Sequence, residues 1–282
     1  MKELTKAYLA TFLLFLLAVP ALAQYKLWYN APAQVWTDAL PLGNGRLGAM
    51  VYGIPGTERI GLNEETIWSG QPNDNANKAA LKAIPEIQRL LFSGKYREAQ
   101  DMASAKVMSA TNWGMAYQTF GDVYISMPNA TNYTNYYREL SLDSAIATTR
   151  YTANGVTFTR ELITNFADNV IQVHLTASKP GQLTFNANFT SPHEDVIIKS
   201  EGNEVTLLGV SSKLEGCKGK VRFMGRMAAD IEGGSQQSRD GVLSVNGANE
   251  ATLYISIATN FVNYQDISGD EHWWSHNFES RQ

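Results

Sequence analysis

Two pairs of neighbouring carboxyl groups are the residues whose type and spacing could do hydrolytic chemistry in this chain. They are Glu64-Glu65 and Glu194-Asp195. Hydrolysis of a glycosidic bond uses two carboxyl groups that face each other across that bond. Adjacent residues of a strand point to opposite faces of a sheet, so neither pair can supply both groups if it lies in a strand. We interpret both pairs as hydrogen-bonded or solvated acids, and we assign no catalytic residue to this sequence.

Two histidines near the C-terminus have a spacing that is found in zinc sites. His272 and His276 stand at i and i+4 and would share a helix face, with Asp270 or Glu279 as oxygen donors. Aromatic residues separate them, and no further Cys or His lies close to them in the sequence. We therefore predict no metal and no cofactor.

The segment Gly43-Asn44-Gly45-Arg46-Leu47-Gly48 satisfies the G-x-G-x-x-G pattern of dinucleotide-binding folds. That pattern requires a buried strand before it and a helix after it, because the helix N-terminus holds the pyrophosphate. Here the flanking residues are 37–41 and 49–52, and neither stretch has a helical pattern. The sequence predicts a glycine turn between two extended segments.

The stretch from Trp28 to Pro72 mixes aromatic side chains with amides and charges. Sugar rings stack on aromatic faces, and their hydroxyls need fixed donors and acceptors, so this mixture suits carbohydrate. Composition alone favours the alternative, in which the aromatics fill a protein core. The residues concerned are Trp28, Tyr29, Asn30, Trp36, Asn44, Arg46, Tyr52, Asn63, Glu64, Trp68 and Gln71.

Composition indicates a globular protein that can bury a core. The chain has 282 residues, of which 44% are hydrophobic and 18% charged, and its formal net charge is -4. Acidic and basic residues are interspersed, so no basic face is available for phosphates and no nucleic acid partner is predicted. Cys217 is the single cysteine, which excludes an internal disulfide.

The N-terminus has the pattern of a secretory signal peptide. Lys2 and Lys6 precede an apolar run from Tyr8 to Val19, and Ala21-Leu22-Ala23 forms an A-x-A cleavage site. The run is shorter than the roughly 20 residues that span a bilayer. We predict cleavage after Ala23, a periplasmic or secreted location, and no membrane association of the mature chain.

From about Val123 onward, apolar residues alternate with polar ones, and many such runs are separated by Gly, Asn or Pro. So many strands predict an all-β fold of two packed antiparallel sheets. Leucines and isoleucines between Leu81 and Leu91 recur instead at helical spacing. Because Pro85 suits a first helical turn and Gly94 a helix C-terminus, we predict a two-helix insertion near residues 85–108, with helices at 85–93 and 95–108.

Several motifs in order resemble glycoside hydrolase family 95, the α-L-fucosidase family. They are LWYNAPAQVWTDALPLGNGRLGAMVYG, ERIGLNEETIWSGQP, LLFSGKYREAQ, YQTFGDVYI, YRELSLDSAIATTRY and ATNFVNYQDISGD, which run from Leu27 to Asp270. The resemblance implies an N-terminal β super-sandwich, followed in the whole enzyme by a helical linker, an α/α catalytic barrel and a C-terminal β domain. It implies an inverting mechanism with a Glu acid and an Asp base in the barrel, beyond Gln282.

On this basis we divide the chain into a signal peptide (1–23), a sandwich domain (24–270) and a divergent tail (271–282), which we expect to reflect a truncated or frameshifted reading frame. The expected partners are a fucosylated oligosaccharide or polysaccharide and the α/α barrel. Candidate substrate-binding residues are Asn63, Glu64, Trp68 and Gln71, with a purely bracing role at the domain interface as the alternative. A non-catalytic glycan-binding module and an inactive gene fragment remain alternatives for the whole chain, and the sequence does not separate fucose from L-galactose.

Overall fold

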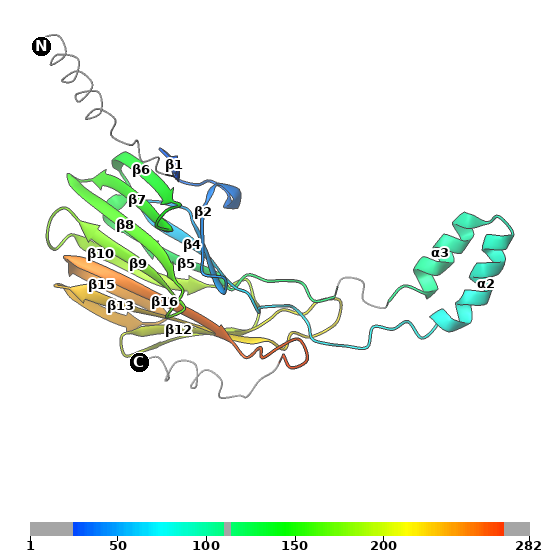
Figure 1. Cartoon of the computed structure of the whole chain (residues 1–282). Helices are drawn as coiled ribbons and strands as arrows, with labels where there is room; N and C mark the ends of the chain where they lie inside the picture. The colour runs from blue at the N-terminus through cyan, green and yellow to red at the C-terminus, as the bar shows by residue number, and fades with distance from the viewer. Residues whose placement is uncertain (1–24, 110–113, 268–282) are drawn as a thin grey trace, which may run out of the picture.

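Two antiparallel β-sheets packed face to face form the body of the computed structural model, which describes residues 25–109 and 114–267 (Figure 1). The predicted all-β sandwich is confirmed. The nine-stranded sheet contains, in spatial order, β1 (Lys26–Tyr29), β6 (Tyr133–Ser141), β7 (Ile146–Ala153), β8 (Val156–Asn165), β9 (Val170–Ala177), β16 (Glu250–Thr259), β13 (Arg222–Glu232), β12 (Glu204–Val210) and β11 (Val196–Glu201). The seven-stranded sheet contains β14 (Ser235–Arg239), β15 (Val242–Ala248), β10 (Leu183–Thr190), β5 (Gly121–Ser126), β4 (Thr57–Glu64), β3 (Leu47–Val51) and β2 (Leu40–Gly43).

Inward-facing side chains of both sheets make one hydrophobic core. At one end of it Phe120 meets Phe189 and Phe223 edge to face, with ring centroids 5.7 and 5.5 Å apart. A glycine makes room for this cluster, because a Cβ at Gly225 would stand 2.3 Å from the Phe120 ring. The strand alternation read from the sequence thus corresponds to inward and outward faces.

Turn chemistry fixes the register of the hairpins. Asn154 and Gly155 both have positive φ, 52° and 71°, and join β7 to β8 in a two-residue turn. The G-x-G-x-x-G segment is the turn between β2 and β3, as the sequence predicted. The Asn44 side chain closes that turn by accepting hydrogen bonds from the backbone N–H groups of Arg46 and Leu47 at 3.0 and 2.7 Å.

The two-helix insertion is confirmed, and its bounds agree with the prediction to within two residues except at the start of the first helix, which begins at Ala80 and not at residue 85. The helices are α2 (Ala80–Phe92) and α3 (Tyr96–Lys106), so Pro85 lies inside α2 and not at its start. A proline there removes only one hydrogen bond of the helix, and the turn before it is held by the Ala83 N–H donating to Ala79 O at 3.2 Å. Gly94 ends α2 as predicted, with φ 73° and the Lys95 N–H donating to Leu90 O.

Both helices stand away from the sandwich at the end of a stalk (Figure 1). We define the stalk as residues 65–73, 114–120 and 211–221, and the arm as the stalk with α2 and α3. Backbone hydrogen bonds tie the three stalk segments together: Ser69 N–H to Ala116 O, Gln118 N–H to Ile67 O, and Gly70 N–H to Ser212 O. Two short 3-10 turns, η1 (Trp36–Asp38) and η2 (Pro128–Ala130), complete the described elements.

Candidate functional site

Strand β4 carries the predicted residues Asn63 and Glu64 to the base of the stalk. Glu64 is the last residue of β4 and has no exposed surface, whereas Glu65 begins the following turn and is exposed. The two carboxyl groups therefore separate, as expected for neighbours at a strand end. The other acidic pair, Glu194-Asp195, is exposed in the connection between β10 and β11.

Glu64 is the centre of a buried polar network. One carboxylate oxygen accepts hydrogen bonds from the backbone N–H and the hydroxyl of Thr66, at 2.7 and 2.6 Å. The other oxygen lies 2.9 Å from Arg46 Nε, and the Thr66 hydroxyl also makes a short hydrogen bond with the hydroxyl of Thr259. Burial raises the pKa of Glu64, against the opposing effects of Thr66 and Arg46. In this conformation Glu64 shapes the site through Thr66 and Arg46 and has no surface with which to touch a ligand.

Asn63 and Trp68 meet at a residue that sequence reasoning did not select, Tyr117. The Asn63 amide donates to the Tyr117 hydroxyl at 3.0 Å, and the Trp68 and Tyr117 rings pack edge to face with centroids 5.3 Å apart. Trp68 is 36% exposed and Tyr117 46% exposed. The Trp68 indole N–H is used internally, since it donates to Glu65 O at 2.9 Å. The cluster thus offers aromatic surface with amide groups beside it, which is what carbohydrate contacts need.

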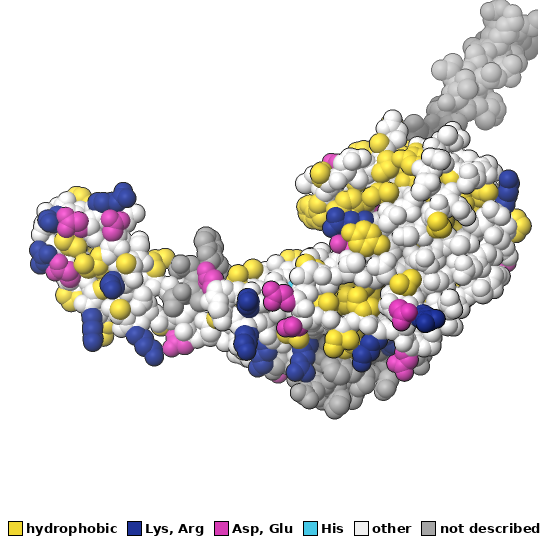
Figure 2. All heavy atoms as spheres, turned by 180° about the vertical axis from the view of Figure 1, so that it is seen from behind, with side chains coloured by type: hydrophobic (Ala, Val, Ile, Leu, Met, Phe, Trp, Pro, Cys, Tyr) yellow, Lys and Arg dark blue, Asp and Glu magenta, His cyan; other side chains and the backbone are white. Residues whose placement is uncertain are grey.

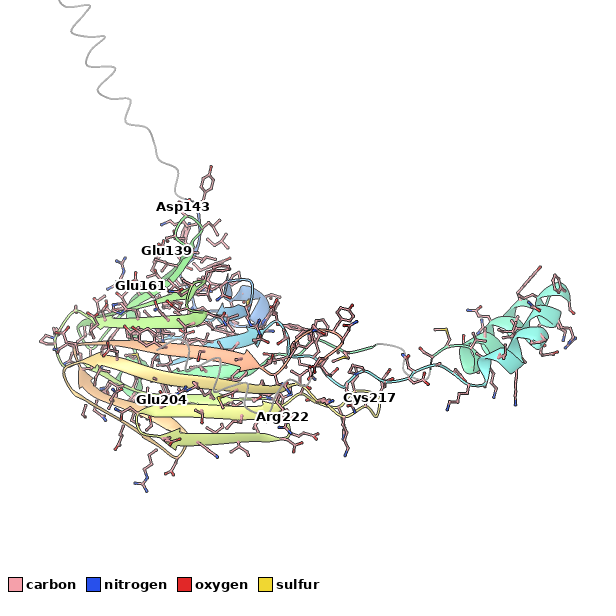
Figure 3. The ribbon with its side chains drawn as sticks, turned by 60° about the horizontal axis from the view of Figure 1, so that its bottom comes forward. Glu139, Asp143, Glu161, Glu204, Cys217 and Arg222 are labelled. Carbon is pink, nitrogen blue, oxygen red and sulfur yellow. The ribbon has the colours of Figure 1, made fainter. Side chains whose placement is uncertain are left out.

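Gln71 lies further along the stalk and does not join this cluster. Its backbone carbonyl accepts from the Asn73 amide at 3.1 Å, and the same amide lies 3.0 Å from Cys217 Sγ. Cys217 belongs to a tight reversal in the 211–221 segment, where it pairs with Leu214 (Figure 3). Of the four predicted substrate-binding residues, the structure brings Asn63 and Trp68 together, buries Glu64 behind them and separates Gln71.

His193 locks the stalk to the sandwich. Its Nε2 lies 2.9 Å from Thr119 O and must donate there, so Nδ1 accepts the hydrogen bond from the Ser212 hydroxyl, also at 2.9 Å. Its ring packs against Phe223 with centroids 4.8 Å apart. Burial lowers the pKa of His193, which favours this neutral imidazole. The base of the stalk is therefore a fixed part of the fold.

The remaining sequence candidates concern the two ends of the chain and a possible metal site. His272 and His276, the predicted signal peptide and the divergent tail lie outside the described residues. Within residues 25–109 and 114–267, no three His, Cys, Asp or Glu side chains gather in a way that could hold a metal ion. None of the described helices is long and apolar enough to cross a membrane.

Comparison with known proteins identifies the family of the sandwich domain. The family described as "Glycosyl hydrolase family 65, N-terminal domain" matches residues 27–264. The chain belongs to this family. The resemblance to α-L-fucosidases is also confirmed: Alpha-L-fucosidase 2 of Arabidopsis thaliana is 37% identical over 188 residues, which cover 65% of this chain and 22% of that protein.

Two further similarities extend over more of this chain. Probable alpha-fucosidase A of Aspergillus niger is 29% identical over 264 residues, which cover 87% of this chain and 32% of the relative. The chain therefore spans about a fifth to a third of the length of these relatives. A putative kojibiose phosphorylase from the human microbiome has the same fold, with a TM-score of 0.50 and 10% identity over 91% of this chain and 34% of that structure.

Proposed function

We propose that this chain is the N-terminal domain of an exported α-L-fucosidase, which hydrolyses terminal α-L-fucosyl linkages with inversion and carries its catalytic acid and base in an α/α barrel outside this sequence. The identity of 37% to Alpha-L-fucosidase 2 of Arabidopsis thaliana carries the proposal. The separation of the Glu64 and Glu65 carboxyl groups agrees with it, because this pair does not supply the two facing carboxyl groups that hydrolysis of a glycosidic bond uses, and the proposal assigns those groups to another domain.

The arm supports a place within a larger hydrolase. Leu81 on α2 and Tyr96 on α3 are exposed, and Phe92 is 92% exposed. Figure 2 shows hydrophobic side chains on the outside of these helices, which project from the sandwich. Apolar surface of this kind is typical of a face that another domain covers. In our proposal the barrel covers the arm, and the Trp68–Tyr117 cluster at its base lies toward the mouth of the active site.

The first test is to read the source DNA across codon 282 in every frame and to express the sandwich together with any barrel that follows. We expect the joined protein to release L-fucose from a fucosylated xyloglucan oligosaccharide, and the present chain alone to release none. Fucose release by the chain alone, or a confirmed stop with no barrel beyond it, would overturn the proposal. Export is tested by N-terminal sequencing of the secreted product, which should begin at Gln24.

The second test concerns Trp68 in the barrel-containing protein. If Trp68 contacts sugar, Trp68→Ala should raise KM about tenfold, which corresponds to a lost aromatic contact of about 1.4 kcal/mol. Trp28→Ala is the matched control, because Trp28 is also exposed and also packs on a tyrosine, Tyr137, at 6.3 Å between ring centroids. Unchanged kinetics with lowered stability of the Trp68 variant would assign it a bracing role instead.

A further inference from the structure

A hollow of about 800 Å³ opens at one end of the sandwich, where turns of the two sheets meet. Its walls are the β2–β3 turn, the β8–β9 turn, the end of β16 and Glu65. The four candidate substrate-binding residues do not line it, whereas Asn44 and Arg46 of the mixed 28–72 stretch do. Its volume falls within the roughly 300–1,000 Å³ range of ligand sites in proteins. It therefore has the size of a binding site and a position distinct from the Trp68–Tyr117 cluster.

The rim of this hollow is preformed by one side chain. The Asn44 amide nitrogen donates to Asn165 O at 2.9 Å and to the Asn169 side-chain oxygen at 3.1 Å. Its oxygen accepts from two backbone N–H groups of its own turn, so two hydrogen bonds close the β2–β3 turn and the other two hold that turn against the β8–β9 turn. A ligand that entered would not have to order these turns, which lowers the entropic cost of binding.

The charged side chains among the described lining residues disfavour an anionic ligand. Arg46 is the one lysine or arginine among the described residues that line it, and this guanidinium already faces Glu64 at 2.9 Å and Glu65 at 3.8 Å. Because this cation is already paired, a phosphate or carboxylate would find no unpaired cation among the described lining residues. A neutral ligand fits this balance.

The remaining wall chemistry matches a sugar. Phe166, in the β8–β9 turn, is 83% exposed and lines the hollow, so its ring offers an apolar face. Asn169, Ser256 and Glu65 supply donors and acceptors around the same space. One aromatic face with several hydrogen-bonding groups is the combination that a pyranose needs, since its C–H face stacks and its hydroxyls require partners.

We propose that this hollow is a carbohydrate-binding site of the sandwich itself, in which Phe166 stacks on a neutral sugar ring. The choice of a fucosylated glycan as ligand rests on the proposed function above. The site would hold part of a glycan away from the reacting bond, and it requires no catalytic group. The competing outcome is that the hollow binds no sugar and that another domain of the hydrolase fills it.

Calorimetric titration of the full chain with a fucosylated xyloglucan oligosaccharide tests the site. We expect measurable heat at millimolar ligand, a Kd about tenfold weaker for Phe166→Ala, and a Kd near that of the unmodified chain for Phe166→Trp, because tryptophan keeps the stacking face. Phe92→Ala is the matched control: it removes a similarly exposed ring from the arm and should leave the Kd unchanged. Ala258→Trp should abolish binding by filling the hollow, which Ala258 lines.

Two results would overturn the inference: no heat at millimolar oligosaccharide, or a Phe166→Ala variant that is folded and binds as tightly as the unmodified chain. Circular dichroism checks folding, and the exposed ring makes its removal harmless to the core. The outcomes separate this inference from the proposed function. Fucose release by the barrel-containing protein without binding by the chain rejects only the hollow, whereas Phe166-dependent binding without fucose release by that protein rejects only the enzyme.

Discussion

Replacing Arg160 tests whether a buried ion pair between the two sheets stabilises β4, the strand that carries Asn63 and Glu64. Arg160 on β8 and Glu58 on β4 are buried, and Arg160 Nη2 lies 2.9 Å from Glu58 Oε2. The same nitrogen donates to Ile54 O at 3.0 Å, and the other Glu58 oxygen accepts from the Gly53 N–H at 2.7 Å. This ion pair therefore joins the nine-stranded sheet to the β3–β4 connection of the other sheet.

Arg160→Met leaves the Glu58 carboxylate buried without its cation. Breaking a buried ion pair by removing one partner costs about 3–5 kcal/mol. That is a large part of the roughly 5–15 kcal/mol by which a domain is stable. We therefore expect the free energy of unfolding to fall by about 3–5 kcal/mol near pH 7, while the core hydrocarbon contacts are largely kept by the methionine side chain.

The pH dependence makes this prediction specific. Burial raises the pKa of Glu58, and Arg160 opposes that shift, so removing Arg160 raises the pKa of Glu58 further. Between the unfolded pKa of about 4.3 and the folded pKa, the folded state binds more protons than the unfolded state, and stability falls as pH rises, by at most about 1.4 kcal/mol per pH unit. The destabilisation should thus be small near pH 4.5 and large near pH 7.

Urea unfolding followed by tryptophan fluorescence at about pH 4.5, 5.5 and 7 measures the effect as the difference between variant and unmodified chain. Arg239→Met is the control, because Arg239 pairs with Asp240 at 3.3 Å on the surface and should cost at most about 0.5 kcal/mol. Glu58→Gln combined with Arg160→Met should recover part of the stability at neutral pH. A loss that is equal at all three pH values would refute the role assigned to the Glu58 charge.

Three further predictions concern the core and the stalk. Burial lowers the pKa of His193 below its unfolded value, so the free energy of unfolding of the unmodified chain should decline as pH falls below about 6.5. In urea unfolding, the His193→Gln variant should lack this part of the decline. The control variant, His174→Gln, should keep it. Gly225→Ala should cost about 1–3 kcal/mol in the same assay, because its Cβ would collide with Phe120, whereas at Gly48 the nearest atom is at an ordinary 3.6 Å and alanine should be tolerated. Tyr117→Phe removes the hydrogen bond from Asn63 and should lower the free energy of unfolding by about 1 kcal/mol; no measurable change would mean that this bond adds nothing over solvent.

Sheet and turn positions were predictable because their signals are local. Alternating apolar residues mark β5, β8, β9 and β10, and Asn154-Gly155 fixes a hairpin, since each depends on neighbours in the sequence. Strand β14 lacked that signal: its sequence is SQQSR, and it is defined by backbone pairing with β15 at the edge of the sheet. Its inward-facing residues, Gln236 and Ser238, are polar, so no apolar alternation reveals the strand.

The candidate site was only partly predictable because its contacts are long-range. Asn63 and Tyr117 are 54 positions apart, and Thr66 and Thr259 are 193 positions apart, so no window of sequence contains either pair. The register of β4 with β5, and the position of β16 in the opposite sheet, bring them together. Residue type could select Asn63 and Trp68, but only the fold could add Tyr117 and bury Glu64.

The arm is a second feature that the sequence predicts only in part. Its helical spacing predicted α2 and α3, and an amphipathic helix normally turns its apolar stripe to a core. Here Leu90 and Ala99 are the residues of these two helices that become buried, because the helices pack mainly on each other and stand clear of the sandwich. The periodicity of a helix predicts an apolar face but does not indicate what covers that face. In our proposal the barrel covers that face, so one further domain would account both for the exposed arm and for the separation of the Glu64 and Glu65 carboxyl groups.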